Sequence, residues 1–373
     1  MIVSLKLVEQ NMNYLNDLEQ LIKINSYTKN KQGVDEVSKL MSTWLEELNF
    51  STIIYERENI GNHILFKSTK TTGTKILLLG HNDTVFPPNT YEGFSKDDRW
   101  IYGPGVCDMK GGNIVALESL RNLFNQNGKI ENIDFLLVSD EETGSDDSKL
   151  LTSELAKDYD LCFVFEAAGA NLEVVTARKG VGTFKINITG IAAHAGNHYD
   201  KGSDANLEAS YKLQELIKLT NLKLGTTVNV GKINGGIGAN TISPTCELLL
   251  EIRYTTTDEK NRVLEALKTI TNTAYVKGTT SILSGDIQRD VMEENKKQLE
   301  LIKEIEKIAE TKIFTEKRGG VSDANIVSSC GVTTLDGFGP FGDGDHTIKE
   351  RALITSFEQR IQLMTKILNH YQI

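Results

Sequence analysis

The chain has 373 residues, of which 39% are hydrophobic and 25% charged, and its formal net charge is −10. These values are typical of a globular protein with two domains or one large one. A net negative chain lacks the basic face that nucleic-acid binding requires, so we expect no nucleic-acid partner. The N-terminus lacks a basic start followed by an apolar run, and no stretch of about 18 apolar residues occurs. We therefore expect a cytoplasmic protein with no membrane partner.

The first half of the chain alternates helical and strand patterns. Apolar residues recur at helical spacing in 15–22 and again in 34–48. Uninterrupted apolar runs follow at 75–80, 134–140 and 161–166, and a helical pattern separates the first two runs. Such runs are typical of strands buried on both faces. The sequence therefore predicts an α/β domain with a mostly parallel sheet flanked by helices.

The pattern changes at about residue 178. Strands and helices then follow in the order β-α-β-β-α-β, which is the split βαβ motif of an α+β, ferredoxin-like domain. The earlier pattern resumes afterwards and ends in a long helix expected from about Lys349. We therefore predict a catalytic domain in two pieces, 1–177 and 288–373, interrupted by an inserted domain at 178–287.

Side chains that can bind metals gather where the predicted strands end. Ligands of an open α/β sheet bind beyond the carboxyl ends of its strands. Five segments deliver His, Asp or Glu there, at 81–83, 108, 140–142, 166 and 343–346. A single such residue is more often a solvated loop residue, but five segments at one sheet edge are harder to explain that way. Two histidines and several carboxylates without cysteine suit zinc, with cobalt or manganese as alternatives.

A glycine-rich loop, GPGVCDMKGG at 103–112, contains one of these carboxylates, Asp108. Glycine allows backbone angles that other residues avoid, and proline fixes its own. Such a segment can hold a shape that ordinary residues would resist. The loop therefore indicates that Asp108 must be held in one place.

Six motifs occur in order along the chain and are followed by His346: GHNDTV, GPGVCDMKGG, SDEETGS, GIAAHAG, GGIGANTISP and GGVSDA. Together they resemble the dinuclear zinc exopeptidase and deacylase family that includes glutamate carboxypeptidase, acetylornithine deacetylase and succinyl-diaminopimelate desuccinylase. The chain is closest in type to glutamate carboxypeptidase. The resemblance implies two zinc ions, and it makes the inserted domain a lid and a dimerisation domain, so we expect a homodimer.

The resemblance also assigns the metal ligands. Asp108 would bridge the two ions, His81 and Glu166 would complete one site, and Glu142 and His346 would complete the other. A carboxylate shared by two cations must keep both oxygens in place, which accounts for the stiff loop around Asp108.

Three further residues receive catalytic roles from the resemblance. Asp83 would accept a hydrogen bond from the second ring nitrogen of His81 and fix its tautomer. Glu141 would be the general base that takes a proton from water and passes it to the leaving amine. His194, in the inserted domain, would reach the active site of the partner subunit and stabilise the oxyanion.

The residues that would hold the substrate lie mostly in the inserted domain. Asn240 and Arg253 match family positions that bind the substrate's carboxylate, and a guanidinium suits a carboxylate because its donors form a two-pronged fork. Gly319 and Gly320 would bring backbone amides close to the same group. Lys317 and Arg318 depart from the small residues of many relatives.

The sequence thus predicts a metal-dependent hydrolase that cleaves an amide bond next to a free carboxylate. Its substrate would be a small peptide, as for a carboxypeptidase, or an N-acyl amino acid, as for a deacylase. Glu rather than Asp at position 166 favours these two branches over aminopeptidases and dipeptidases. The alternative from another class is a non-catalytic binding protein that keeps the fold, and the presence of all matched ligands argues against it.

Overall fold

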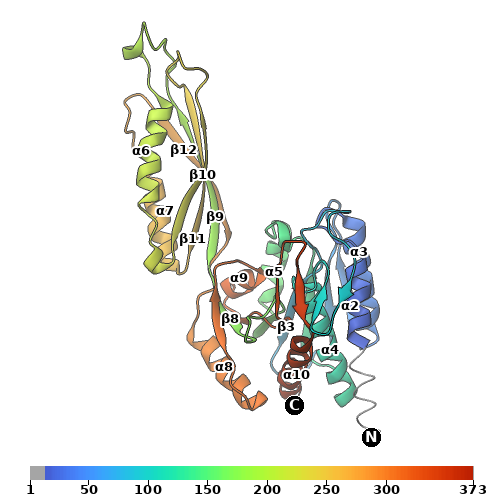
Figure 1. Cartoon of the computed structure of the whole chain (residues 1–373). Helices are drawn as coiled ribbons and strands as arrows, with labels where there is room; N and C mark the ends of the chain where they lie inside the picture. Colours follow the sequence, from blue (N-terminus) through green and yellow to red (C-terminus); the bar gives the residue numbers. More distant parts are fainter. Residues whose placement is uncertain (1–12, 373) are drawn as a thin grey trace. The chain divides into compact units, whose positions relative to one another are not determined.

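The computed structural model describes residues 13–372, which form two compact units (Figure 1). Unit 1 contains the chain up to Thr176, Glu294–Arg318, and the chain from Ser322 onwards. Unit 2 contains Ala177–Glu293 together with Gly319–Val321. The segment at 319–321 was not expected in the inserted domain, which the sequence ended at 287. Within residues 13–372, no helix is both long and apolar enough to cross a membrane.

A six-stranded sheet with the order β1-β2-β6-β3-β7-β14 forms the centre of unit 1. Strands β6, β3, β7 and β14 run parallel, whereas β1 and β2 form an antiparallel hairpin at one edge. Every residue of β3 and β6 is buried, which explains their uninterrupted apolar sequences. The predicted mostly parallel sheet is confirmed. Its strands are β1 Ser51–Tyr55, β2 His63–Lys67, β3 Ile76–His81, β6 Ile133–Val138, β7 Leu161–Val164 and β14 Thr333–Leu335.

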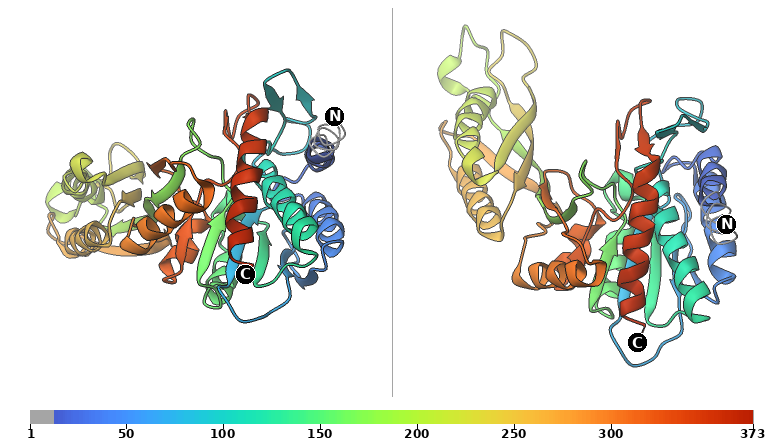
Figure 2. Two further views of the ribbon diagram at one scale, coloured as in Figure 1. Left: turned by 90° about the horizontal axis from the view of Figure 1, so that it is seen from below. Right: turned by 60° about the horizontal axis from the view of Figure 1, so that its bottom comes forward.

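Helices flank this sheet, as the sequence predicts. Apolar residues of five helices share one core cluster with alternate residues of the central strands; the helices are α2 Asn13–Lys23, α3 Lys31–Glu46, α4 Lys110–Asn127, α8 Lys296–Ala309 and α10 Ile354–His370. Helices α4 and α10 lie side by side (Figure 2). Helix α9 (Asp323–Ser329) packs on β7 and β14, and α5 (Ser148–Ala156) packs on α9.

Short strands in unit 1 were not predicted. A second sheet has the order β15-β16-β5-β4, and β13 pairs with β8. The C-terminal helix begins at Ile354 and not near Lys349, because Arg351–Leu353 pair with Trp100–Tyr102 in this second sheet. The strands are β4 Ser95–Lys96, β5 Trp100–Tyr102, β8 Val174–Arg178, β13 Thr315–Arg318, β15 Gly342–Asp343 and β16 Arg351–Leu353.

Unit 2 has the predicted ferredoxin-like architecture. Its antiparallel sheet has the order β10-β11-β9-β12 and shares one hydrophobic core with two helices. The elements follow the β-α-β-β-α-β order: β9 Gly180–Thr189, α6 Ala205–Ile217, β10 Thr227–Gly235, β11 Thr245–Tyr254, α7 Thr257–Asn272 and β12 Thr280–Arg289.

A buried ion pair lies on α6, and both of its members also bind the backbone at the end of α7 and just after it. Lys212 and Glu208 are both fully buried, and their charged groups are 2.9 Å apart. The Lys212 ammonium also donates to three main-chain carbonyl groups, and Glu208 accepts the backbone N–H groups of Tyr275 and Val276. Every buried charge here has partners, as a folded interior requires.

Candidate metal centre

The register of the parallel strands brings three predicted ligand segments to one edge of the sheet. His81, the last residue of β3, pairs with Val138, and Leu79 pairs with Val164. Strand β6 leads into a single 3₁₀ turn at Glu141–Thr143, and Glu166 follows the end of β7. Because the carboxyl ends of these strands are aligned, the residues that follow them lie close together at this edge of the sheet.

The fourth segment is the glycine-rich loop before α4. Gly103 and Gly105 have φ angles of 154° and 84°, and the latter lies in the region that favours glycine. A side chain at Gly105 would also crowd Lys110 and Thr84. The loop ends at Asp108, immediately before α4, as the sequence suggested.

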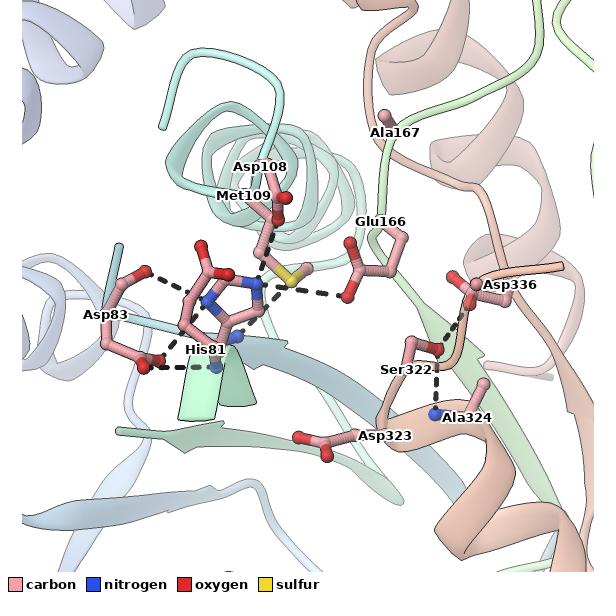
Figure 3. Close-up of polar contacts among 12 residues, drawn as sticks. His81, Asp83, Asp108, Met109, Glu166, Ala167, Ser322, Asp323, Ala324 and Asp336 are labelled. Carbon is pink, nitrogen blue, oxygen red and sulfur yellow. Dashed lines mark hydrogen bonds and ion pairs between the residues drawn. The ribbon is translucent and has the colours of Figure 1, made fainter. Parts of the chain in front are cut away.

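Asp108 lies between two histidines (Figure 3 shows the His81 side). Its Oδ1 is 3.1 Å from Nε2 of His81, and its Oδ2 is 3.2 Å from Nε2 of His346. Nε2 of His81 is 3.9 Å from Glu166, and Nε2 of His346 is 3.0 Å from Glu142. The two carboxylate oxygens of Asp108 therefore face the two predicted halves of the site.

Two overlapping groups of ligand atoms have a geometry suited to metal ions. One contains His81, Glu141 and Glu166, and the other contains His81, Asp108 and Glu142. Within each group the ligand atoms all lie within 4.8 Å of one another. Glu141, predicted as the general base, thus lies beside the predicted ligands.

Asp83 lies behind His81 and is completely buried. Nδ1 of His81 is 3.0 Å from the main-chain oxygen of Asp83 and 3.3 Å from its Oδ1 (Figure 3). The other carboxylate oxygen of Asp83 accepts hydrogen bonds from the Thr28 hydroxyl, at 2.7 Å, and from the backbone N–H of Glu142, at 3.3 Å. Asp83 therefore orients His81 with two acceptors and also ties down the Glu142 backbone.

The pKa shifts of the predicted ligands show that several negative charges lie close together. Burial and the charge of Asp108 raise the pKa of Glu142 to about 8 and that of Glu166 well above its usual range. Burial alone would lower the pKa of His81, but its hydrogen bonds to Asp108 and Asp83 raise it well above the usual value. Hydrogen bonds to Asp108 and Glu142 raise the pKa of His346 to about 11.

This charge balance fits divalent cations. The raised pKa values of these histidines and glutamates reflect the carboxylates that crowd around Asp108, and bound cations would offset that negative charge. The donors are imidazole nitrogens and carboxylate oxygens, which suit zinc and also cobalt or manganese. The predicted ligand residues therefore fit a centre of two cations.

His194 and Asn240 lie on neighbouring loops of unit 2. The N–H of Ala195 donates to the main-chain oxygen of Asn240 at 2.9 Å. Nδ1 of His194 accepts the N–H groups of Gly196 and Asn197, both at 3.1 Å. An Nδ1 that accepts leaves the proton on Nε2, so the exposed His194 ring presents an N–H donor.

Arg253 and Gly319 are also neighbours within unit 2. Arg253 donates to Glu251 through Nε, at 2.7 Å, and Nη2, at 3.3 Å, and its Nη1 donates to the Gly319 oxygen at 3.1 Å. A guanidinium has five N–H donors, so two remain for another acceptor. The main-chain oxygen of Gly320 accepts a hydrogen bond from Arg178 at 3.2 Å.

Two sets of hydrogen bonds that support the site were not predicted from the sequence. The Ser145 hydroxyl donates to Asp323 at 2.5 Å, which ties the turn carrying Glu141 and Glu142 to the start of α9. Glu350 accepts three backbone N–H groups of the Asp108 loop. Asp323 lies in the GGVSDA motif and Ser145 in the SDEETGS motif, but neither hydrogen bond was expected.

This donor set lies at the carboxyl edge of an open α/β sheet, where such sheets bind their ligands, and it defines a candidate metal-binding α/β protein. The chain belongs to peptidase family M20/M25/M40, whose model matches residues 77–370. This membership confirms the resemblance seen in the motifs. The chain is thus a hydrolase of a metal-dependent family in which relatives carry both carboxypeptidase and deacetylase names.

Individual relatives agree with this family. Carboxypeptidase G2 of a Pseudomonas species is 27% identical over 366 residues, which cover 94% of this chain and 87% of the relative. Acetylornithine deacetylase of Proteus mirabilis is 29% identical over 243 residues, which cover 60% of this chain and 62% of the relative. The crystal structure of aminopeptidase PepT from Bacillus cereus has a TM-score of 0.80 at 20% identity and covers 97% of this chain and 99% of its own. At that identity, the likeness to PepT shows the fold alone.

Proposed function

We propose that the chain is a carboxypeptidase-type metallopeptidase that cleaves an amide bond next to a free carboxylate. The observation that carries this proposal is the convergence of predicted ligands on Asp108, with Glu141 grouped beside His81 and Glu166; the predicted ligands are His81, Asp108, Glu142, Glu166 and His346. The nearly full-length similarity to carboxypeptidase G2 supports the carboxypeptidase branch.

Different residues of the chain would have different roles in the reaction. We assign Glu141 the role of general base, which takes a proton from the attacking water and returns it to the leaving amine. The two cations, when bound, supply Lewis acidity that acidifies water and polarises a carbonyl. His194 would donate its Nε2–H to the developing oxyanion, a role that its tautomer supports.

An N-acyl-amino-acid deacylase is the second candidate, and the similarity to acetylornithine deacetylase favours it. Both activities cut an amide beside a free carboxylate and would use the same residues. A hydrolysis screen over peptides with varied C-terminal residues and over N-acyl amino acids separates them. A non-catalytic binding protein of the same fold would bind cations but hydrolyse neither set.

Metal content tests the dinuclear centre. We expect protein purified without chelator to contain close to two zinc-like equivalents per chain, because Asp108 turns one oxygen toward each histidine. Chelation should abolish hydrolysis, and added Zn²⁺, Co²⁺ or Mn²⁺ should restore it. Elemental analysis with an activity titration measures both. A single tightly held ion, with no activity gained from more metal, would contradict a centre of two ions.

Arg253 tests the free-carboxylate requirement. Replacing Arg253 with Ala should raise KM for a substrate with a free carboxylate by roughly 10- to 100-fold, because a charged hydrogen-bonded contact contributes about 1.5–3 kcal/mol. The same substrate with that carboxylate amidated should be a poor substrate for both proteins and should show no such difference. Equal effects on both substrates would remove Arg253 from carboxylate binding.

We also propose a homodimer formed through unit 2. Strand β10 is an edge strand of its sheet, and such edges can pair with another copy. Exposed apolar side chains accompany it, with Ile233 on β10 and Leu207 and Tyr211 on the adjacent helix α6. Pairing of the same surface on two copies would give a symmetric dimer.

A further inference from the structure

Glu350 ends the turn that carries His346. The turn is closed by backbone hydrogen bonds from Thr347 to Gly344, at 3.0 Å, and from Glu350 to Thr347, at 3.1 Å. Glu350 is only 1% exposed, although it follows a surface-exposed turn. Its main-chain oxygen also accepts the Tyr91 hydroxyl at 3.1 Å. Both its backbone and its side chain are therefore fixed.

The carboxylate of Glu350 accepts hydrogen bonds from the loop that carries Asp108. Its Oε2 accepts the N–H of Gly105 at 3.0 Å, and its Oε1 accepts those of Cys107, at 3.0 Å, and Asp108, at 3.2 Å. Removing this buried acceptor would leave three backbone N–H groups of the loop without it, and an unsatisfied buried donor is costly. The conformation of the Asp108 loop therefore depends on Glu350.

The same two segments also touch directly. A Cβ added at Gly342 would lie 2.3 Å from Cβ of Cys107, so the two backbones approach as closely as glycine permits. Across this contact Nε2 of His346 reaches Oδ2 of Asp108 at 3.2 Å. Glu350 thus joins the turn of one predicted ligand to the loop of another.

We propose that Glu350 is a positioning residue of the metal centre, which sets Asp108 and His346 at the separation needed to share one cation. The inference rests on the proposed function, because it requires the dinuclear centre. Glu350 itself would contact neither metal nor substrate. Its effect would be greatest at the site that Glu142 and His346 complete, since that site spans both segments.

The test compares two Glu350 variants with a matched control. Glu350→Gln replaces one accepting oxygen by an amide group that cannot accept an N–H, and Glu350→Asp keeps the charge but shortens the reach by one methylene. Glu208→Gln is the control, because Glu208 is an equally buried carboxylate that accepts two backbone N–H groups in unit 2. Metal is removed from the unmodified protein and the three variants with EDTA, and each protein is titrated with Zn²⁺ in competition with a chromophoric chelator. Thermal unfolding of the metal-free proteins is also recorded.

We expect both Glu350 variants to bind one of the two cations about 10- to 100-fold less tightly than the unmodified protein, as for other residues that support ligands. The Glu208 variant should unfold at a lower temperature but keep both zinc affinities. Glu350→Asp, the more conservative change, keeps the measurement possible if Glu350→Gln does not fold.

The outcomes separate the two proposals. If the unmodified protein binds two cations and the Glu350 variants bind both with unchanged affinity, the positioning role is wrong and the proposed function stands. Equal losses of affinity in the Glu350 and Glu208 variants would also overturn it, since they would reflect general destabilisation. If the unmodified protein binds fewer than two cations, the dinuclear centre fails, and the positioning role fails with it.

Discussion

Replacing Glu141 with Gln is expected to lower kcat by roughly 10²- to 10⁴-fold, because the change removes a general base and keeps the shape of the side chain. The zinc content should stay near that of the unmodified protein, since five other side chains supply the predicted ligands. Activity over the first turnovers and metal content are measured on the same preparation.

The neighbouring Glu142 supplies the matched control. Its carboxylate is 3.0 Å from His346 and nearly buried, and we predict it as a ligand. Glu142→Gln should therefore lower both metal content and activity, and excess zinc should restore part of the activity. Glu141→Gln should gain nothing from excess zinc. A Glu141 variant that loses metal and regains turnover on reconstitution would make Glu141 a ligand and leave the base unassigned.

Several of the predicted ligand segments could be placed at one sheet edge from the sequence because they follow buried strands of one sheet. Parallel strands of one sheet have their carboxyl ends at the same edge, and the buried apolar runs of β3 and β6 identify them as neighbouring strands of this kind. The pairing of His81 with Val138 brings the residues after β3 and β6 together. Short motifs at strand ends can therefore be placed from sequence alone.

Glu350 could not be predicted in this way. It lies 245 positions from Gly105 along the chain, and Glu350 itself belongs to none of the six motifs. Strands β15 and β16 are also too short to show a periodic pattern, so the sequence extended the last helix back over Arg351–Leu353. A contact between distant segments that is made by backbone N–H groups places little constraint on the residue types that supply those groups. Such a contact is therefore difficult to recognise in a sequence.

His194 is the second residue whose loss should nearly abolish turnover. His194→Ala removes a predicted oxyanion donor, and losing one such donor costs about 10²- to 10³-fold in kcat. Metal content should not change, because all predicted ligands lie in unit 1 and His194 lies in unit 2. His198→Ala, in the same loop, is the control and should keep normal kcat.

Mixing two inactive variants tests whether His194 acts across the proposed dimer. His194→Ala and Glu141→Gln proteins are mixed in equal amounts under conditions that exchange subunits. If His194 serves the partner's site, each heterodimer has one working site, formed by the chain that keeps Glu141 and by His194 of the other chain. Random exchange makes about half of the dimers heterodimers, so the mixture should reach about a quarter of the unmodified activity. If His194 serves its own chain, no heterodimer has both residues at one site, and the mixture stays inactive even when subunit exchange is verified by mass.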